Sequence, residues 1–240
     1  MKAILLAAGR GTRLWKGNMG IPKCILDIGG KTLLDHSLHL LRNKAIDEIA
    51  VVVGYQADDI VKKITHERIR FFYNPFFDKT NSIASLWFAK EFIHDNDDLL
   101  LLNADVFFEA PLLEEVLTTA LSPVLFSDHT RKDVGDYKLG YQDGILLKHG
   151  KDLDGSEASG EYIGIAKIDR SFIPRFKKRL INFIDMQKHD LWWEDVLYSF
   201  KNEEAVYVKE ISTDLFWAEV DVLEDYKRIL HYTCGLYTKK

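Results

Sequence analysis

The chain has 240 residues, enough for one α/β domain or two small ones, and 47% of them are hydrophobic, which is ample for a buried core. Its formal net charge of −5 argues against a broad nucleic-acid-binding surface, so no nucleic-acid partner is expected. A strand begins already at residue 2 and no apolar run is long enough to cross a membrane, which predicts a cytoplasmic protein without a signal peptide or membrane contact. The two cysteines are too few for a disulfide framework and agree with a reducing compartment.

Apolar runs alternate with helix-period segments through the first half of the chain. The runs predict strands at 2–8, 48–53, 69–73, 99–103 and 124–127. Helices are predicted between them at 33–44 with Thr32 as cap, 58–64, 83–92 with Asn81 or Ser82 as cap, and 112–120. This alternation predicts an α/β fold with a doubly wound, mostly parallel sheet, whose ligands lie at the carboxyl ends of the strands.

The alternation of apolar runs and helix-period segments ends after residue 128. Segments 138–141 and 145–148 predict a hairpin around Asp143-Gly144, which forms a small β-rich insertion, and 162–167 can return to the main sheet. Later helices are predicted at 171–178, 193–201 and 223–230, with an apolar strand at 217–221 before the last of them. The chain has no repeat, linker or low-complexity tract, so a single domain over 1–240 is favoured.

The turn after the first strand predicts a phosphate-binding loop. Glycines at positions 9 and 11 let the backbone approach an anion and turn its N–H groups toward it, and the arginine at position 13 adds a fork of donors. A dinucleotide fingerprint would need a third glycine where Leu14 stands, and a P-loop would need Gly-Lys-Ser/Thr. We therefore expect a polyphosphate at this loop, and the candidate ligand-binding residues are Leu6, Ala8, Gly9, Gly11, Thr12 and Arg13.

The whole pattern, Leu-Ala-Ala-Gly-x-Gly-Thr-Arg-Leu followed by Pro22-Lys23, resembles the nucleotidyltransferase superfamily that makes NDP-sugars and CDP-alcohols from NTPs. The resemblance implies a Rossmann-like nucleotidyltransferase fold, with residues 1–128 binding the nucleotide and 129–240 the acceptor. It also implies that Arg13 and the loop hold the β- and γ-phosphates while Lys23 neutralises charge at the reacting phosphates. The family usually has Pro-Leu-Thr after Arg-Leu, so the different segment 15–20 is expected to be more mobile here.

Two aspartates match the metal ligands of that family. Asp105 follows the strand at 99–103, and Asp221 ends the strand at 217–221, with Glu219 as a supporting or substitute ligand. Mg²⁺ favours one or two carboxylates together with substrate phosphates, so the resemblance implies a Mg²⁺ site here. The alternative interpretations are a strand-end turn for Asp105 and a helix cap for Asp221.

The nucleotide base is expected to lie at the start of the helix predicted at 83–92. The Asn-x-x-x-Ser-Leu arrangement there resembles the phosphocholine and phosphonate cytidylyltransferases, which implies CTP as the nucleotide. Asn81, Ser82 and Ser85 can present donors and acceptors to a pyrimidine, and Gly54-Tyr55 is the predicted opposite wall of the pocket. Plain helix capping by Asn81 and Ser82 is the alternative, and it is compatible with base contacts.

The acceptor is expected among polar and aromatic residues of the second half. The stretch from Asp136 to Ile165 also resembles those cytidylyltransferases, and the candidate contacts are Lys138, Lys151, Glu161, Trp192, Trp193, Glu194 and Asp195. Two tryptophans followed by two acids favour an aromatic and anionic box for an amine or quaternary ammonium group. One tryptophan in the core and two acids at a helix start are an equally weighted interpretation.

The combined prediction is a Mg²⁺-dependent cytidylyltransferase acting on a small phosphorylated alcohol or phosphonate, for example phosphocholine or 2-aminoethylphosphonate. The first alternative is a sugar-1-phosphate nucleotidyltransferase, and the second is a nucleotide-sensing module without catalysis. A homodimer is left open. Cys24 is interpreted as a small core residue rather than a nucleophile, and His36 and His39 are expected on the surface of a helix.

Overall fold

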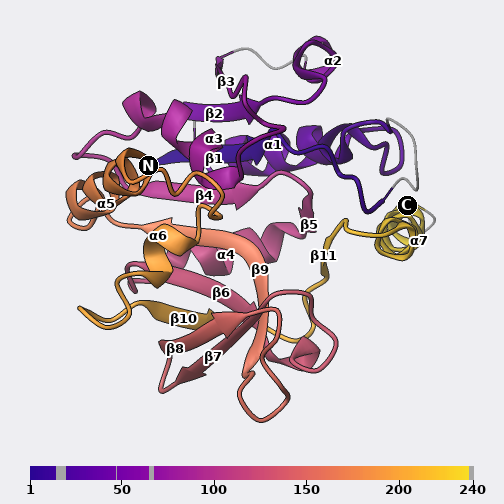
Figure 1. Cartoon of the computed structure of the whole chain (residues 1–240). Helices are drawn as coiled ribbons and strands as arrows, with labels where there is room; N and C mark the ends of the chain where they lie inside the picture. Colours follow the sequence, from indigo (N-terminus) through magenta and orange to yellow (C-terminus); the bar gives the residue numbers. More distant parts are fainter. Residues whose placement is uncertain (15–19, 47, 65–67, 238–240) are drawn as a thin grey trace.

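The computed structural model describes residues 1–14, 20–46, 48–64 and 68–237. Four parallel strands form the first half of one sheet: β1 (Lys2–Ala7), β2 (Glu48–Val53), β3 (Ile69–Tyr73) and β4 (Leu99–Asn103). They lie in the order β3-β2-β1-β4 (Figure 1). Most of the segment 15–20, for which we expected mobility, lies outside the described residues.

The second half of the sheet is mixed. It comprises β9 (Gly160–Ile168), β6 (Val124–Asp128), β10 (Tyr207–Glu210), β8 (Ile145–Gly150) and β7 (Lys138–Gln142), in that order beyond β4. The long strand β9 runs antiparallel to both β4 and β6, and so returns to the main sheet as the sequence predicted. Strand β7 also pairs with β9, which closes five strands into a ring in the lower part of Figure 1.

Helices cover both faces of the sheet. The side chains of α1 (Leu33–Asn43), α2 (Ala57–Lys63) and α4 (Ala110–Thr118) pack on one face. Those of α3 (Ser82–Phe88), α5 (Ile173–Asp185) and α6 (Asp195–Tyr198) pack on the other. In β1, Leu5 faces the first group and Ile4 the second, which explains why this central strand is apolar at successive positions.

A third small core holds the chain's last helix in place. Strands β5 (Val106–Phe108) and β11 (Trp217–Glu219) pair antiparallel, and α7 (Leu223–Tyr237) packs beside them through Ile229. This two-stranded unit brings residue 105, at the end of β4, next to residues 219–221. Its β11 strand was predicted as part of the strand at 217–221, whereas β5 was not predicted.

Several predicted boundaries were wrong. The helix expected at 83–92 ends at Phe88 and is followed by a 3-10 turn, Lys90–Phe92, and the helix expected at 193–201 is only Asp195–Tyr198. Conversely, α5 and α7 continue to Asp185 and Tyr237, well past their predicted ends. Strand β10 had not been predicted. The ends of these elements depend on packing against other elements, and local propensity contains no information about that packing.

His36 was expected on a helix surface and this expectation was wrong. Its ring is buried, stacks on Phe107 with centroids 4.5 Å apart, and donates from Nε2 to the Phe108 carbonyl at 2.8 Å. Burial lowers the pKa of His36 to about 4, so the ring is neutral at pH 7. Its neighbour His39 is exposed as expected.

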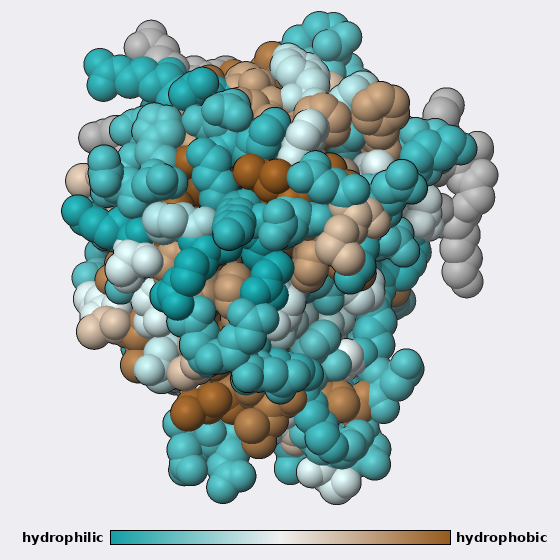
Figure 2. All heavy atoms as spheres, turned by 60° about the vertical axis from the view of Figure 1, so that its left-hand side comes forward, coloured by the Kyte–Doolittle hydropathy of each residue, from teal (hydrophilic) through white to brown (hydrophobic). Residues whose placement is uncertain are grey.

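Within the described residues, no helix combines the length and the apolar character that crossing a bilayer requires. The face shown in Figure 2 is mainly hydrophilic, and its apolar side chains emerge in small scattered groups. The expected single domain and the homodimer left open remain predictions.

Gly164 lies in β9 where this strand passes β4 and β5. Its φ is +76°, and a Cβ there would lie 2.8 Å from Cγ2 of Val106 and 3.3 Å from Cβ of Asn103. Gly164→Ala should therefore lower the free energy of unfolding by about 1–3 kcal/mol, from backbone strain and overpacking, as measured by urea denaturation. Gly235→Ala in α7 is the control, since a Cβ there meets nothing within 4 Å, and helix propensity predicts a gain of about 0.5–1 kcal/mol. Equal stabilities for the two variants would contradict the prediction.

Candidate functional site

The candidate site forms where β1 and β4 end side by side. Leu6 pairs with Asn103, and the Ala104 amide donates to the Leu6 carbonyl at 3.1 Å. The glycine loop after β1 and Asp105 after β4 therefore leave the same edge of the sheet, as expected for adjacent parallel strands.

The second glycine of the loop is required by a close contact with Lys23. Gly11 has a φ of +62°, and a Cβ at this position would lie 2.8 Å from Cγ of Lys23. A side chain here would displace the lysine stem, which lies along the loop. Lys23 itself begins a 3-10 turn after Pro22, whose carbonyl accepts from the Ile25 amide at 3.0 Å. The loop and the lysine are thus fitted to each other.

Lys23 joins the two predicted metal ligands. Its ammonium donates to Asp105 Oδ2 at 3.1 Å and to Asp221 Oδ1 at 2.8 Å. Burial opposes the charge on Lys23, but Asp105 and Asp221 more than offset this and raise its pKa above the usual range. Lys23 is therefore fixed as a cation at the carboxyl ends of β4 and β11.

Glu219 completes a cluster of three acids. Oxygen atoms of Asp105, Glu219 and Asp221 lie within 4.8 Å of one another, a spacing that can hold a metal ion. The Val220 amide donates to the Asp105 carbonyl at 2.9 Å, so the β5–β11 pairing is what brings the three together. Burial, Asp105 and Asp221 raise the pKa of Glu219 well above its usual value, because three close acids repel one another's charges.

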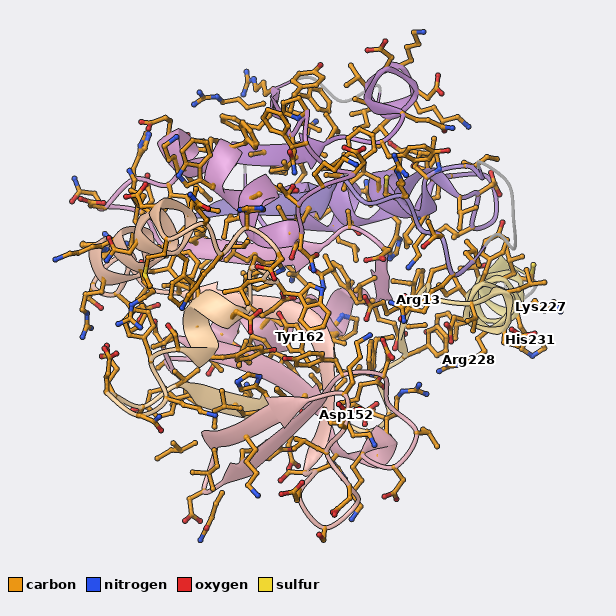
Figure 3. The ribbon with its side chains drawn as sticks, viewed as in Figure 1. Arg13, Asp152, Tyr162, Lys227, Arg228 and His231 are labelled. Carbon is orange, nitrogen blue, oxygen red and sulfur yellow. The ribbon has the colours of Figure 1, made fainter. Side chains whose placement is uncertain are left out.

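Arg13 reaches from the glycine loop toward both halves of the chain. Its guanidinium bonds Asp221 Oδ1 at 2.8 Å and Asp136 Oδ2 at 2.9 Å, and Lys151 donates to the same Asp136 oxygen at 2.8 Å. Figure 3 places Arg13 between the main sheet and α7, on the side of the chain where the β5–β11 unit lies. Arg13 is half exposed, so its fork of donors is accessible to an anion.

Three cavities meet around this cluster. A glycine-loop cavity of about 300 Å³ is lined by Leu6, Ala7, Gly9, Gly11, Thr12, Arg13, Lys23, Cys24, Asn81, Ala104 and Asp105. An α3 cavity of about 280 Å³ is lined by Leu6, Ala8, Gly9, Phe77, Thr80, Asn81, Ser82, Ser85, Asn103, Asp105, Trp192, Glu194 and Glu219. An aromatic cavity of about 100 Å³ is lined by Arg13, Asn103, Asp136, Tyr137, Lys151, Tyr162, Trp192, Glu194, Tyr198 and Glu219. Most of the predicted site residues thus share one connected region.

The predicted base-binding residues lie on the α3 cavity, but not all are equally available. Asn81 caps α3 by accepting from the Ser82 amide, and its Nδ2 donates to the Asp190 carbonyl at 3.2 Å. Its carboxamide is therefore engaged on both sides. Ser82 and Ser85, one turn apart, line the cavity together with Thr80, and all three residues carry hydroxyls.

Gly54 and Tyr55 lie behind the cavity wall. A Cβ at Gly54 would lie 2.7 Å from Cβ of Phe77 and 3.0 Å from that of Ala8, both of which line the cavity. The Tyr55 amide donates to the Ala8 carbonyl at 3.1 Å, and the Tyr55 ring lies 6.0 Å from that of Phe77. Sequence reasoning had missed Phe77, which forms the surface of the wall that Gly54-Tyr55 supports.

The two tryptophans have different environments. Trp193 is fully buried and donates from Nε1 to Asn103 Oδ1 at 2.8 Å, while Trp192 is 38% exposed and lines the α3 and aromatic cavities. Asp195 accepts from the Trp192 amide at 2.8 Å, as an acid at a helix start does. Glu194 instead is buried on the cavity wall, 3.2 Å from Nδ2 of Asn103. Each of the two interpretations of this segment therefore describes part of it.

Two predicted acceptor contacts point elsewhere. Lys138 donates to the Leu153 carbonyl at 3.1 Å, away from the three cavities. Glu161 is paired with Arg131 and accepts from the Asp136 amide at 2.8 Å, and it lines a fourth cavity beside Trp217, which shares Arg13, Asp136 and Glu219 with the aromatic cavity. Their proposed acceptor contacts remain predictions. Cys24 is buried, and burial raises the pKa of its thiol to about 12, as suits a core residue rather than a nucleophile.

Comparison with known proteins agrees with this geometry. The sequence model of the MobA-like NTP transferase domain matches residues 3–134, more than half of the chain. The chain belongs to the MobA-like NTP transferase family. Its match covers the glycine loop, Lys23, α3 and Asp105, while the aromatic cavity is built largely from residues beyond it.

Relatives of this NTP transferase extend the comparison over almost the whole chain. It is 28% identical to the CTP:phosphoglutamine cytidylyltransferase of Campylobacter jejuni, covering 94% of this chain and 97% of that protein. It is 26% identical to the choline-phosphate cytidylyltransferase of Streptococcus pneumoniae, covering 95% and 96%. The solved CTP:phosphocholine cytidylyltransferase of S. pneumoniae shares its fold with a TM-score of 0.78 at 23% identity, covering 96% of this chain and 98% of that one.

Three tyrosines of the aromatic cavity were missed by sequence reasoning as site residues. Tyr137 and Tyr198 stack with centroids 5.8 Å apart, and Tyr162 lies on β9 near the centre of Figure 3. The hydroxyls of Tyr162 and Tyr198 are buried and have no hydrogen-bond partner among the described residues. No local pattern marks them, because they come from a loop, a strand and a helix that only the fold brings together.

Glu194 should make stability depend on pH. Burial, partly offset by hydrogen bonds, raises the pKa of Glu194 from 4.5 to about 8. Between these values the unfolded chain has released the proton while the folded chain retains it, so the free energy of unfolding falls as pH rises. In metal-free buffer, Glu194→Gln should reduce this fall between pH 5 and 8, by up to about 1.4 kcal/mol per pH unit. Urea denaturation at several pH values measures it, with the exposed Glu224→Gln as control. An unchanged slope would refute the assignment.

Proposed function

We propose that the protein is a Mg²⁺-dependent cytidylyltransferase that transfers CMP from CTP to a small phosphorylated or phosphonate acceptor and releases pyrophosphate. The observation that carries this proposal is the cluster of Lys23, Arg13 and three carboxylates at the edge of the glycine-loop cavity, which Lys23, Arg13 and Asp105 line. The activities for which the two relatives are named, with CTP and phosphoglutamine or phosphocholine, support the choice of nucleotide and acceptor class.

The reaction needs positioning and charge neutralisation more than proton transfer. An oxygen of the acceptor phosphate forms a bond to the α-phosphorus of CTP, and the bond from that phosphorus to the bridging oxygen breaks, so pyrophosphate leaves. A phosphomonoester has its second pKa at about 6, so the attacking oxygen is already ionised near neutral pH and no general base is required. Lys23 is placed to neutralise charge at the reacting phosphates.

The triphosphate would lie in the glycine-loop cavity. The loop amides and Arg13 are suited to its β- and γ-phosphates, since Arg13 is accessible and its present partners are carboxylates, which a phosphate can replace. Gly11 keeps the loop open enough for Lys23 to lie against it. In this arrangement, Arg13 exchanges Asp136 and Asp221 for phosphate oxygens when the nucleotide binds.

The acid cluster fits a hard divalent cation. Asp105, Glu219 and Asp221 present oxygens, which Mg²⁺ prefers, and their mutual repulsion is the kind of strain that a dication relieves. When bound, Mg²⁺ polarises the α-phosphate and neutralises developing charge. Lys23 and Arg13 each pair with a carboxylate of the cluster and hold it in place.

The acceptor would lie in the aromatic cavity with a cationic end toward its rings and acids. Trp192 already has one cation over its face, since Lys151 Nζ lies 5.6 Å from the ring centroid. Two buried tyrosine hydroxyls without partners among the described residues and the carboxyl of Glu194 offer hydrogen bonds. A desolvated cation–π contact is worth about 2 kcal/mol, which favours a charged amine over a neutral isostere. Lys151 is placed to contact the acceptor's phosphorus-bound oxygens.

Lys23→Ala should lower kcat by at least about a hundredfold while the thermal unfolding transition persists, because one preorganised charge is removed from the reaction centre. Steady-state pyrophosphate release with saturating CTP and acceptor measures this. Lys44→Ala is the matched control, since Lys44 also pairs with an acid, Glu114, but far from the cavities. Near-normal turnover by Lys23→Ala would exclude its proposed role.

An array of four NTPs and several acceptors should identify the reaction. We expect pyrophosphate release with CTP and an acceptor that has a cationic end, such as phosphocholine or 2-aminoethylphosphonate, to exceed that with a neutral phospho-polyol by more than about tenfold. Glu194→Gln should reduce this preference, because it removes the ionisable group from the cavity wall. Best turnover with a hexose 1-phosphate and another NTP would instead indicate a sugar nucleotidyltransferase.

A further inference from the structure

A buried asparagine, Asn74, lies directly behind the α3 cavity. Asn74 follows β3, is 1% exposed, and its amide donates to the Val53 carbonyl at 2.8 Å. Its side chain donates to Ser85 Oγ, and Ser85 lines the cavity although it is only 3% exposed. Asn74 therefore decides what this buried hydroxyl offers to a ligand.

The orientation of the Asn74 carboxamide is fixed by its neighbours. The Phe76 amide, which can only donate, lies 2.9 Å from Oδ1, so that atom must be the acceptor. Nδ2 then faces the other way and donates to Thr80 Oγ1 at 3.1 Å and to Ser85 Oγ at 3.0 Å. The Thr80 hydroxyl donates a hydrogen bond to the Phe76 carbonyl at 2.8 Å. Its oxygen therefore remains free to accept from Asn74 Nδ2.

The Ser85 hydroxyl consequently offers a proton to the cavity. It accepts one proton of Asn74 Nδ2, and it has no acceptor for its own proton within the described residues. Ser82, one turn earlier on α3, is arranged alike, because its Oγ accepts from the backbone amide of Trp193 at 2.9 Å. A buried hydroxyl proton left without an acceptor costs free energy, so this wall favours a ligand atom that accepts.

Resting on the proposed function, we propose that Ser85, oriented by Asn74, donates to N3 of cytosine and thereby selects CTP over UTP. N3 of cytosine is an acceptor, whereas N3 of uracil carries a hydrogen. The N3–H of a uracil at this place could reach only the remaining lone pair of Ser85 Oγ, and the Ser85 proton would be left without an acceptor in a buried site. Asn74 is a positioning residue here, and Ser85 is the group that touches the base.

Two substitutions test the assignment through the ratio of kcat/KM for CTP to that for UTP. Ser85→Ala removes the donor and should lower this ratio by about tenfold, the effect of one buried hydrogen bond together with the unpaired group it leaves. Asn74→Asp keeps the shape but replaces Nδ2 by an acceptor, so Ser85 donates inward and presents its lone pairs to the cavity. This variant should lower the ratio further, because kcat/KM falls for CTP and rises for UTP. Ser37→Ala, a buried serine of α1 that donates to the Leu33 carbonyl, is the control and should keep the wild-type ratio.

The outcomes separate this inference from the proposed function. A wild-type enzyme that uses CTP and UTP equally would overturn the cytidylyltransferase proposal itself. If the wild type prefers CTP but Ser85→Ala lowers kcat/KM equally for both nucleotides, Ser85 contacts an atom that both bases share, and only the present inference is wrong. An unchanged ratio in a folded Asn74→Asp variant would overturn the orienting role of Asn74. Should that variant lack a thermal unfolding transition, the ratio for Ser85→Ala decides alone.

Discussion

The site depends on one partly buried cation, Lys23, held between Asp105 and Asp221. These three residues come from a turn after the glycine loop, from the end of β4 and from the end of β11. Without the lysine, three carboxyls would be crowded together with little to offset their repulsion. Burial, followed by Asp105 and Asp221, raises the pKa of Glu219, and Lys23 opposes this rise. The same contacts hold the last helix and its two-stranded unit against the first half of the chain.

Around this cation the protein uses small residues where its backbone segments approach closely. Gly11 leaves room for the Lys23 stem, Gly54 for Phe77 and Ala8, and Gly164 for Val106 and Asn103. Each of these contacts lies at or behind a cavity wall. The shape of the site is therefore set by the absence of side chains at three positions as much as by the charged groups that line it.

Asn74 and Asn103 each orient a polar group on the wall of the α3 cavity. Asn103 accepts from Trp193 Nε1 and faces Glu194 with its Nδ2, while Asn74 accepts from Phe76 and faces Ser85. In each case a donor that cannot reverse fixes the carboxamide, and the carboxamide then fixes what a group on the cavity wall can offer. The family match ends at residue 134. The aromatic cavity, which we propose for the acceptor, is built largely from later segments.

Short-range sequence patterns were enough to predict the first β-strand and the glycine loop. They also marked the Pro22-Lys23 pair and the two aspartates as candidate site residues. A strand that is apolar at successive positions, glycines next to it and carboxylates at strand ends are local patterns with a local physical cause. Other features became visible only in the tertiary structure. Trp193 lies in the core while Trp192 lines a cavity, and Tyr137, Tyr162 and Tyr198 converge on the aromatic cavity. The Asn81 carboxamide is hydrogen-bonded to the backbone. The tertiary structure also decided that His36 is buried and that the helix after Ser82 stops at Phe88. Burial, and the hydrogen-bond partners that burial imposes, arise from segments far apart in the chain, and no window of sequence contains both partners.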